Sequence, residues 1–148
     1  MKTMEKKLNV LFLCTGNSCR SQMAEGWARH LKGDVIEAFS AGICPVGVNK
    51  MAVEVMAEAG IDISNQKSKH LDDLAGVDFD YVITLCDNAR EHCPVFPGKA
   101  KMIHKSFADP TFVSGTREIV LGKFREVRDQ IRDFIETMPQ SLENRNDQ

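Results

Sequence analysis

Apolar residues occur along the chain in two patterns, short continuous runs and repeats at helical spacing. Apolar runs of strand length predict buried β-strands at residues 9–13, 35–42, 79–85 and, more weakly, 101–104. Apolar positions three or four residues apart predict helices at residues 21–31, 49–59, 71–74 and 116–138. Because strands alternate with helices, we expect an α/β fold in which helices cover a parallel sheet.

The length and composition fit a single domain. A chain of 148 residues can bury a normal core without disulfide bonds. We expect residues 1–148 to form this one domain, with flexible tails at 1–7 and 140–148. The net charge of −2 argues against a nucleic acid or an anionic membrane as a partner. No apolar run has transmembrane length and no signal-peptide core is present, so we expect a cytoplasmic protein, and we expect a monomer.

Residues 14–21, CTGNSCRS, lie between the first predicted strand and the first predicted helix. The unpaired N–H groups of a helix N-terminus favour an anion, and Gly16 and Asn17 tolerate the left-handed angles of a curled loop. Arg20 can hold two oxygens of an anion through its planar guanidinium. The same field favours the thiolate form of Cys14. The segment therefore predicts an oxyanion pocket with a nucleophile at its base. The alternative is that Cys14 is only a small core residue.

The other cysteines and the histidines are candidates for reactive thiols or metal ligands. The five cysteines are an odd number and are unevenly spaced, which in a reducing compartment indicates reactive thiols or a metal site before a disulfide framework. Together with the four histidines they match no common metal-binding spacing, so we expect no metal site and no cofactor. Cys86 follows a predicted strand, which brings it to the same sheet edge as residues 14–21.

Several segments together resemble one known family. Residues 10–26, VLFLCTGNSCRSQMAEG, are similar to the phosphate loop of the low-molecular-weight tyrosine phosphatase fold, in its arsenate reductase branch. The likeness extends from about residue 8 to residue 138, with further matches at 40–42, 47–49, 60–64, 84–87 and 93–94. The resemblance implies a single three-layer domain with a four-stranded parallel sheet flanked by helices. It also implies reduction of arsenate to arsenite by reduced thioredoxin, a step in arsenic detoxification.

The resemblance also implies roles for individual residues. Cys14 attacks the arsenic of bound arsenate, Cys86 attacks the sulfur of Cys14 and expels arsenite, and Cys93 attacks Cys86. Thioredoxin then reduces the Cys86–Cys93 disulfide. Asp109, which precedes Pro110 on a loop, protonates the departing oxygen. The implied substrate-binding residues are Thr15, Gly16, Asn17, Ser18, Cys19, Arg20 and Ser21.

A potassium site is found in some relatives of the resembled family, at positions that correspond here to Asn17, Glu25 and Ser40 and to an aspartate. The aspartate position is Lys69 in this chain, whose ammonium can replace the charge of the cation. We therefore do not expect a potassium requirement.

The spacing of Cys86 and Cys93 limits how they can pair. If residues 86–93 are helical, seven steps separate the two Cα atoms by roughly 10.5 Å. A disulfide tolerates less than about 7 Å between Cα atoms. We therefore expect this segment to unwind when the two sulfurs bond.

Three other functions stay open at this stage. A phosphotyrosine phosphatase would share Cys14, Arg20 and Asp109, but it needs aromatic walls around its substrate, and the only tyrosine is Tyr81 in a predicted strand. A non-enzymatic redox or arsenite-sensing protein would leave Arg20 and Asp109 without a role. A reductase coupled to glutaredoxin or mycothiol would not need Cys93.

Overall fold

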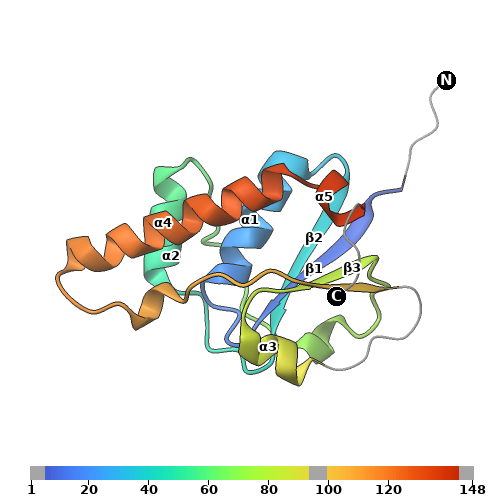
Figure 1. Cartoon of the computed structure of the whole chain (residues 1–148), viewed down its shortest axis with the longest axis horizontal. Helices are drawn as coiled ribbons and strands as arrows, with labels where there is room; N and C mark the ends of the chain where they lie inside the picture. Colours follow the sequence, from blue (N-terminus) through green and yellow to red (C-terminus); the bar gives the residue numbers. More distant parts are fainter. Residues whose placement is uncertain (1–5, 94–99, 144–148) are drawn as a thin grey trace.

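Four parallel strands form the centre of the molecule. The computed structural model describes residues 6–93 and 100–143, and the strands are β1 (Leu8–Cys14), β2 (Ile36–Gly42), β3 (Tyr81–Thr84) and β4 (Lys101–His104). Their order in the sheet is β2-β1-β3-β4, and each pair of neighbours is parallel (Figure 1). The predicted four-stranded parallel sheet is confirmed, and each strand ends within two residues of its expected bounds.

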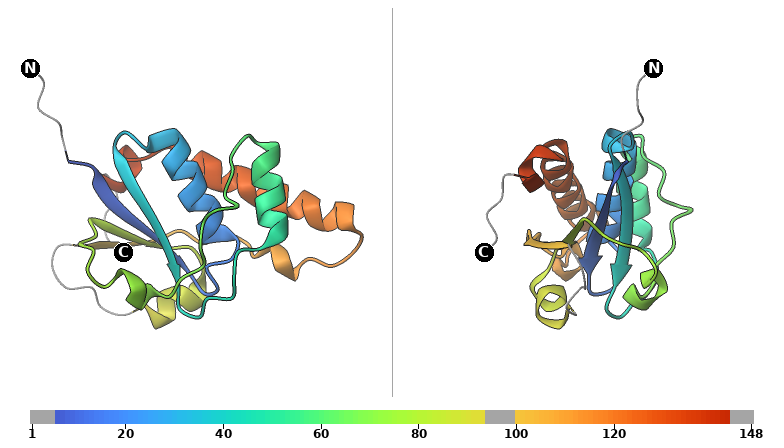
Figure 2. Two further views of the ribbon diagram at one scale, coloured as in Figure 1. Left: turned by 180° about the vertical axis from the view of Figure 1, so that it is seen from behind. Right: turned by 90° about the vertical axis from the view of Figure 1, so that its right-hand side faces the viewer.

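Helices flank this sheet. They are α1 (Arg20–Lys32), α2 (Lys50–Glu58), α3 (Asp87–His92), α4 (Arg117–Glu136) and α5 (Gln140–Glu143), with two 3₁₀ turns, η1 (Leu71–Leu74) and η2 (Pro110–Phe112). Helix α1 packs on β1 and β2, and α4 lies across α1 and α2 (Figures 1 and 2). The apolar pattern does not predict α3, because only Ala89 of its six residues is buried.

The chain after Pro139 differs from the sequence prediction. A flexible tail is predicted there, but residues 140–143 form α5, so the prediction is wrong for these residues. Leu142 is buried in the core, and the Thr137 hydroxyl donates a hydrogen bond to Ser141 Oγ at 2.8 Å. Proline has no N–H group to leave unpaired, so it is tolerated where a helix begins as well as where one ends. Of the other tail residues, Lys6 and Lys7 are exposed, and residues 1–5 and 144–148 lie outside the described chain.

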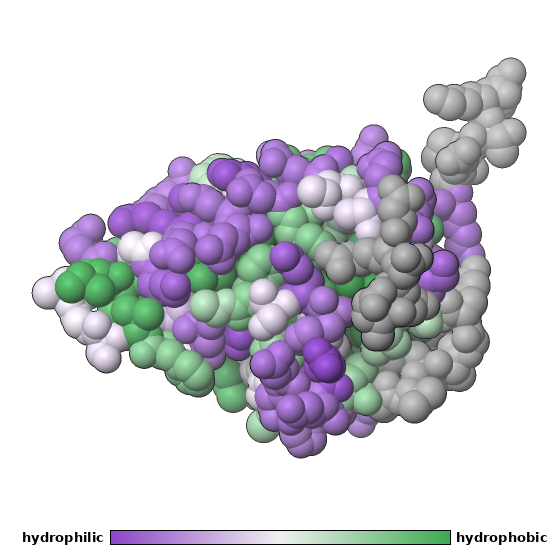
Figure 3. All heavy atoms as spheres, in the orientation of Figure 1, coloured by the Kyte–Doolittle hydropathy of each residue, from purple (hydrophilic) through white to green (hydrophobic). Residues whose placement is uncertain are grey.

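Helix α4 covers the core with one apolar face. Its buried residues follow the three- and four-residue spacing that predicts the helix: Leu121, Phe124, Val127, Ile131, Phe134 and Ile135. Val120, expected on this face, is only half-buried, and Leu121 is buried instead. Figure 3 shows hydrophilic residues along the outer surface of α4. The apolar face holds α4 against α1 and α2, so these three helices stay packed together.

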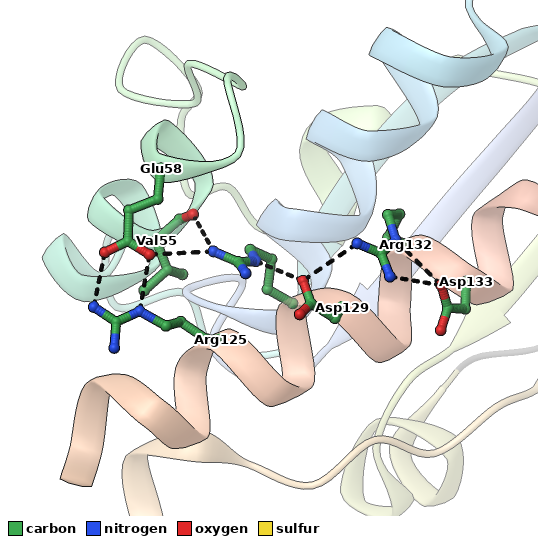
Figure 4. A network of polar contacts seen from close by, with 7 residues as sticks. Val55, Glu58, Arg125, Asp129, Arg132 and Asp133 are labelled. Carbon is green, nitrogen blue, oxygen red and sulfur yellow. Dashed lines mark hydrogen bonds and ion pairs between the residues drawn. The ribbon is translucent and has the colours of Figure 1, made fainter. Parts of the chain in front are cut away.

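Arginine side chains of α4 tie it to α2 (Figure 4). Arg125 donates two hydrogen bonds of 2.9 Å to the carboxylate of Glu58, and Arg128 donates to the same carboxylate and, at 2.9 Å, to the carbonyl oxygen of Val55. Hydrogen bonding from Arg125 lowers the pKa of Glu58. The stability from this pair is therefore present at neutral pH and is lost as the pH falls through the lowered value. Arg132, by contrast, pairs with Asp129 and Asp133 of its own helix.

We predict that Arg128→Ala lowers the free energy of unfolding by about 1 to 2 kcal/mol, because the Val55 carbonyl loses its donor and the arginine stem no longer packs. The matched control Arg132→Ala should lower it much less, because Arg132 pairs only with exposed carboxylates of its own helix. Urea titrations of both variants measure the difference. Equal losses in the two variants would contradict the prediction.

Candidate active site

Residues 14–20, here called the anion loop, connect the end of β1 to the start of α1. The segment before α2 braces the loop from outside: the carbonyl oxygens of Thr15, Gly16 and Ser18 accept hydrogen bonds of 2.8, 3.0 and 3.0 Å from its backbone amides. In a trans peptide the carbonyl and the next N–H point in opposite directions. The N–H groups that follow these three carbonyls therefore face the inside of the loop, where an oxyanion can accept them.

Asn17 gives the loop its curl. It has a φ of 47°, the left-handed conformation expected for this residue, whereas Gly16 does not have a positive φ. The Asn17 side chain is fully buried; its amide donates to Ser21 Oγ at 2.8 Å, and its carbonyl oxygen accepts from the Gln22 amide and the Lys69 backbone N–H, both at 2.9 Å. The side chain thus joins the loop to α1 and to the segment before η1.

Cys14 lies at the base of the loop, with its sulfur 2.9 Å from Ser21 Oγ. Because Ser21 already accepts a hydrogen bond from Asn17, its own hydroxyl hydrogen is available to the sulfur. The Ser21 hydroxyl thus directs its hydrogen at the sulfur of the predicted nucleophile. The second cysteine of the loop differs: burial raises the pKa of Cys19 to about 12, so it stays a thiol at neutral pH. The environment therefore favours Cys14 as the nucleophile.

Arg20 and Asp109 meet at the rim of the loop. Arg20 Nη2 lies 3.3 Å from Asp109 Oδ2, and Nη1 donates to the carbonyl oxygen of Phe107 at 3.0 Å. The other carboxylate oxygen, Oδ1, accepts from the N–H and the hydroxyl of Thr111 at 3.0 and 2.7 Å. This arrangement places the predicted acid beside the predicted anion-binding arginine. These two contacts leave further N–H groups of the Arg20 guanidinium for a ligand.

Cys86, which lies between β3 and α3, contacts the anion loop. It is the N-cap of α3, and its sulfur accepts the Ala89 N–H at 3.4 Å. The sulfur is also 3.4 Å from Thr15 Oγ1, which accepts a 2.7 Å hydrogen bond from the Asn88 amide. The Thr15 hydroxyl hydrogen is therefore available to the sulfur of Cys86. Two hydrogen-bond donors therefore converge on one buried sulfur.

Cys93 stands at the other end of α3, as its C-cap. It is half-buried, and burial raises the pKa of its thiol. No disulfide joins any of the five cysteines, all of which lie in the described residues. The structure therefore brings Cys14, Arg20, Asp109 and Cys86 together, but it separates Cys93 from Cys86 by the full length of a helix, about 10.5 Å between Cα atoms.

A ring of polar side chains supports the loop from behind, and the sequence patterns do not reveal it. Buried Gln22 donates to the Asn17 carbonyl oxygen at 3.0 Å and accepts from Gln66. From Gln66 the ring continues through Arg29, Glu25 and Ser40. The Lys69 ammonium completes it, with 3.0 Å hydrogen bonds to the carbonyl oxygens of Ser40 and Lys67. The resemblance implies that Asn17, Glu25, Ser40 and Lys69 lie together, whereas it says nothing of Gln22, Arg29 and Gln66.

The described residues contain neither a metal-binding cluster nor a membrane-spanning helix. No group of three or more histidine, cysteine, aspartate or glutamate side chains within residues 6–93 and 100–143 could hold a metal ion. Over the same residues, no helix has the length and apolar character needed to cross a bilayer. Asn17 and Ser40 contact Lys69, and Glu25 contacts Ser40. That the chain does not require potassium stays a prediction.

Comparison with known proteins gives the family. The model of the low molecular weight phosphotyrosine protein phosphatase family matches residues 9–148. The chain belongs to this family. This is the family that the phosphate loop resembles, and the fold expected from that resemblance is the one observed.

The similar proteins in this family include arsenate reductases. The arsenate reductase of Bacillus subtilis is 48% identical over 138 residues, which cover 90% of this chain and 99% of the relative. A solved arsenate reductase in the phosphate binding state has 34% identity and a TM-score of 0.71, covering 88% of this chain and 95% of that one. A thioredoxin-dependent arsenate reductase of Corynebacterium glutamicum has 29% identity and a TM-score of 0.65, covering 94% of this chain and 65% of that one.

Gly42, at the end of β2, provides a test of the loop geometry. A Cβ atom at this position would lie 2.7 Å from the Thr15 carbonyl oxygen and 2.9 Å from the Asn17 nitrogen, both backbone atoms. We predict that Gly42→Ala displaces the loop and weakens phosphate binding at least about tenfold, because the converging N–H groups move by several tenths of an ångström. Isothermal titration with phosphate measures the loss.

Gly122→Ala is the matched control for this test. Gly122 is inside α4, and in the described chain a Cβ there would have no atom within 4 Å apart from its chain neighbours and the adjacent backbone of its own helix. The protein should therefore bind phosphate as before and be slightly more stable. Unchanged phosphate affinity in Gly42→Ala would show that the close approach does not shape the loop.

Proposed function

We propose that this chain reduces arsenate to arsenite by a relay of three cysteines, Cys14, Cys86 and Cys93, with thioredoxin as the electron donor, and so detoxifies arsenic. One observation carries the proposal: a second thiol, Cys86, lies 3.4 Å from a residue of the anion loop that holds Cys14. A phosphatase needs one nucleophile in this loop and has no use for the second. The arsenate reductases among the relatives, one of them thioredoxin-dependent, support the proposal.

The first step binds and activates arsenate. The inward N–H groups of the anion loop and the remaining N–H groups of the Arg20 guanidinium hold its oxygens. The Cys14 thiolate attacks arsenic and forms a sulfur–arsenic bond. Asp109, as a carboxylic acid, gives its proton to the departing oxygen, which leaves as water. The product is an As(V) thioester on Cys14.

The second step transfers electrons to arsenic. The Cys86 thiolate attacks the sulfur of Cys14, and the electron pair of the sulfur–arsenic bond moves onto arsenic. Arsenic is thereby reduced from As(V) to As(III), arsenite leaves, and Cys14 and Cys86 are oxidised to a disulfide. The Ala89 N–H and the Thr15 hydroxyl hold the attacking sulfur beside the loop.

The third step moves the oxidation away from the loop. The Cys93 thiolate attacks Cys86, which forms the Cys86–Cys93 disulfide and returns Cys14 as a thiolate. Because Cys86 and Cys93 cap opposite ends of α3, this attack requires the helix to unwind. Unwinding also removes Cys93 from the burial that raises its pKa, and so favours its thiolate. The dithiol of thioredoxin then reduces the new disulfide and completes the cycle.

We predict that Cys14→Ser, Cys86→Ser and Cys93→Ser each abolish repeated arsenate turnover with thioredoxin, thioredoxin reductase and NADPH. A single turnover separates Cys93→Ser from the other two variants. Cys93→Ser should release one arsenite per chain and stop as the Cys14–Cys86 disulfide, whereas Cys14→Ser and Cys86→Ser should release none. Cys44→Ser, which changes an exposed cysteine, is the control and should keep full activity. Sustained turnover by Cys86→Ser or Cys93→Ser would refute the relay, and loss only in Cys14→Ser would favour a phosphatase.

Asp109→Asn tests the acid. We predict a decrease of about 10²- to 10⁴-fold in single-turnover arsenite release, because the departing oxygen loses its proton donor. Disulfide formation between Cys86 and Cys93 under oxidised glutathione should continue at the wild-type rate, since it does not involve Asp109. Rapid-quench measurement of arsenite separates the two steps. Normal arsenite release by this variant would remove Asp109 from the mechanism.

A further inference from the structure

His104 is joined to the helix that carries Cys86, although the relay gives it no role. It is the last residue of β4, and both of its ring nitrogens have partners. Nδ1 lies 2.8 Å from Thr84 Oγ1, and Nε2 lies 3.0 Å from Asp87 Oδ1. Asp87 is the first residue of α3 and directly follows Cys86. A side chain on the sheet thus reaches the residue next to the second nucleophile.

The contact between His104 and Asp87 holds in both protonation states of the ring. When the ring is neutral, the Thr84 hydroxyl donates to Nδ1, and Nε2 carries the hydrogen that it donates to the Asp87 carboxylate. When the ring is protonated, Nδ1 donates to Thr84 instead, and the Thr84 hydroxyl turns to the Ile103 carbonyl oxygen, 3.4 Å away. Thr84 therefore orients the imidazole toward Asp87 at either charge.

Helix α3 depends on such contacts because it buries little surface. Of its six residues only Ala89 is buried. Among the residues described, two side-chain contacts join its first turn to the rest of the molecule: Asn88 to Thr15 and Asp87 to His104. An isolated helix of this length is not stable in water. These contacts therefore make a measurable part of its stability, and both act at the end where Cys86 lies.

We propose that His104 is a positioning residue: through Asp87 it holds the first turn of α3 and keeps Cys86 against the anion loop. The latch, as we call the His104–Asp87 pair, favours the arrangement in which Cys86 faces Cys14. It opposes the unwinding that lets Cys93 reach Cys86. The catalytic meaning of the latch rests on the proposed function, but its effect on α3 does not.

The experiment measures the equilibrium between the dithiol and the Cys86–Cys93 disulfide in a glutathione redox buffer. Oxidised glutathione takes two electrons and two protons from the two thiols, which gives the disulfide and two molecules of reduced glutathione. The proteins carry Cys14→Ser, so that Cys14 does not compete for Cys86. Thiol trapping and peptide mapping quantify the Cys86–Cys93 pair. No arsenate is used, so the result is independent of whether arsenate is the substrate.

We expect His104→Gln and Asp87→Asn each to raise the equilibrium constant for disulfide formation about two- to fivefold, the size expected when an exposed ion pair is lost. In the Asp87→Asn background, His104→Gln should have no further effect, because the pair acts as a unit. Glu91→Gln removes the same charge from an exposed position of the same helix and should leave the constant unchanged.

Amide exchange gives a second measure of the same equilibrium. The N–H of Arg90, which donates to the Cys86 carbonyl oxygen at 3.1 Å, should exchange faster in His104→Gln by the factor seen in the redox titration. The proposal is overturned by an unchanged disulfide equilibrium in His104→Gln. It is equally overturned if His104→Gln acts fully in the Asp87→Asn background, or if Glu91→Gln produces the same shift.

Discussion

The site depends on the left-handed backbone of one residue, Asn17. An L-residue in this conformation costs about 1 kcal/mol or more, and it persists only where its surroundings require it. Here the requirement is visible: the Asn17 side chain is buried and bonded to Ser21, Gln22 and the Lys69 backbone. Releasing these contacts would leave a buried amide unpaired, which costs more than the strained angle. The curl that turns the loop amides inward is thus fixed by side-chain hydrogen bonds behind the loop.

The polar ring behind the loop explains how a charged group can support it without weakening the core. Glu25 is buried, and a buried carboxylate is unfavourable unless donors satisfy its oxygens. Ser40 and Arg29 supply these donors, and the Lys69 ammonium adds a positive charge on the neighbouring Ser40 carbonyl. The ring joins α1, β2 and the segment before η1, which are far apart in the sequence. It therefore fixes the relative position of the three segments that surround Asn17.

The sequence predicts the sheet and the anion loop because both depend on local signals. Continuous apolar runs identify the strands, and the cysteine and arginine between a strand and a helix identify the loop. The resemblance implies that Glu25, Ser40 and Lys69 of the polar ring lie together. Its two glutamines could not be predicted, since Gln22 and Gln66 are ordinary helix and loop residues until the fold brings them together. Helix α3 and α5 were missed for a related reason. Each is short and depends on contacts that the local sequence does not show. For α3 these are the contacts at its N-cap, Cys86, and for α5 the burial of Leu142.

In the proposed relay, the two ends of α3 serve two tasks that set opposite demands on the helix. Cys86 must first be held near the loop, which requires contacts at the start of the helix, and these contacts are seen at Ala89, Asn88 and Asp87. Cys93 must later come within bonding distance of Cys86, which a stable helix forbids. A helix buried along its length would satisfy the first requirement and prevent the second. A short, exposed helix that is held mainly at its first turn satisfies both, because the contacts that position the nucleophile are few enough to break.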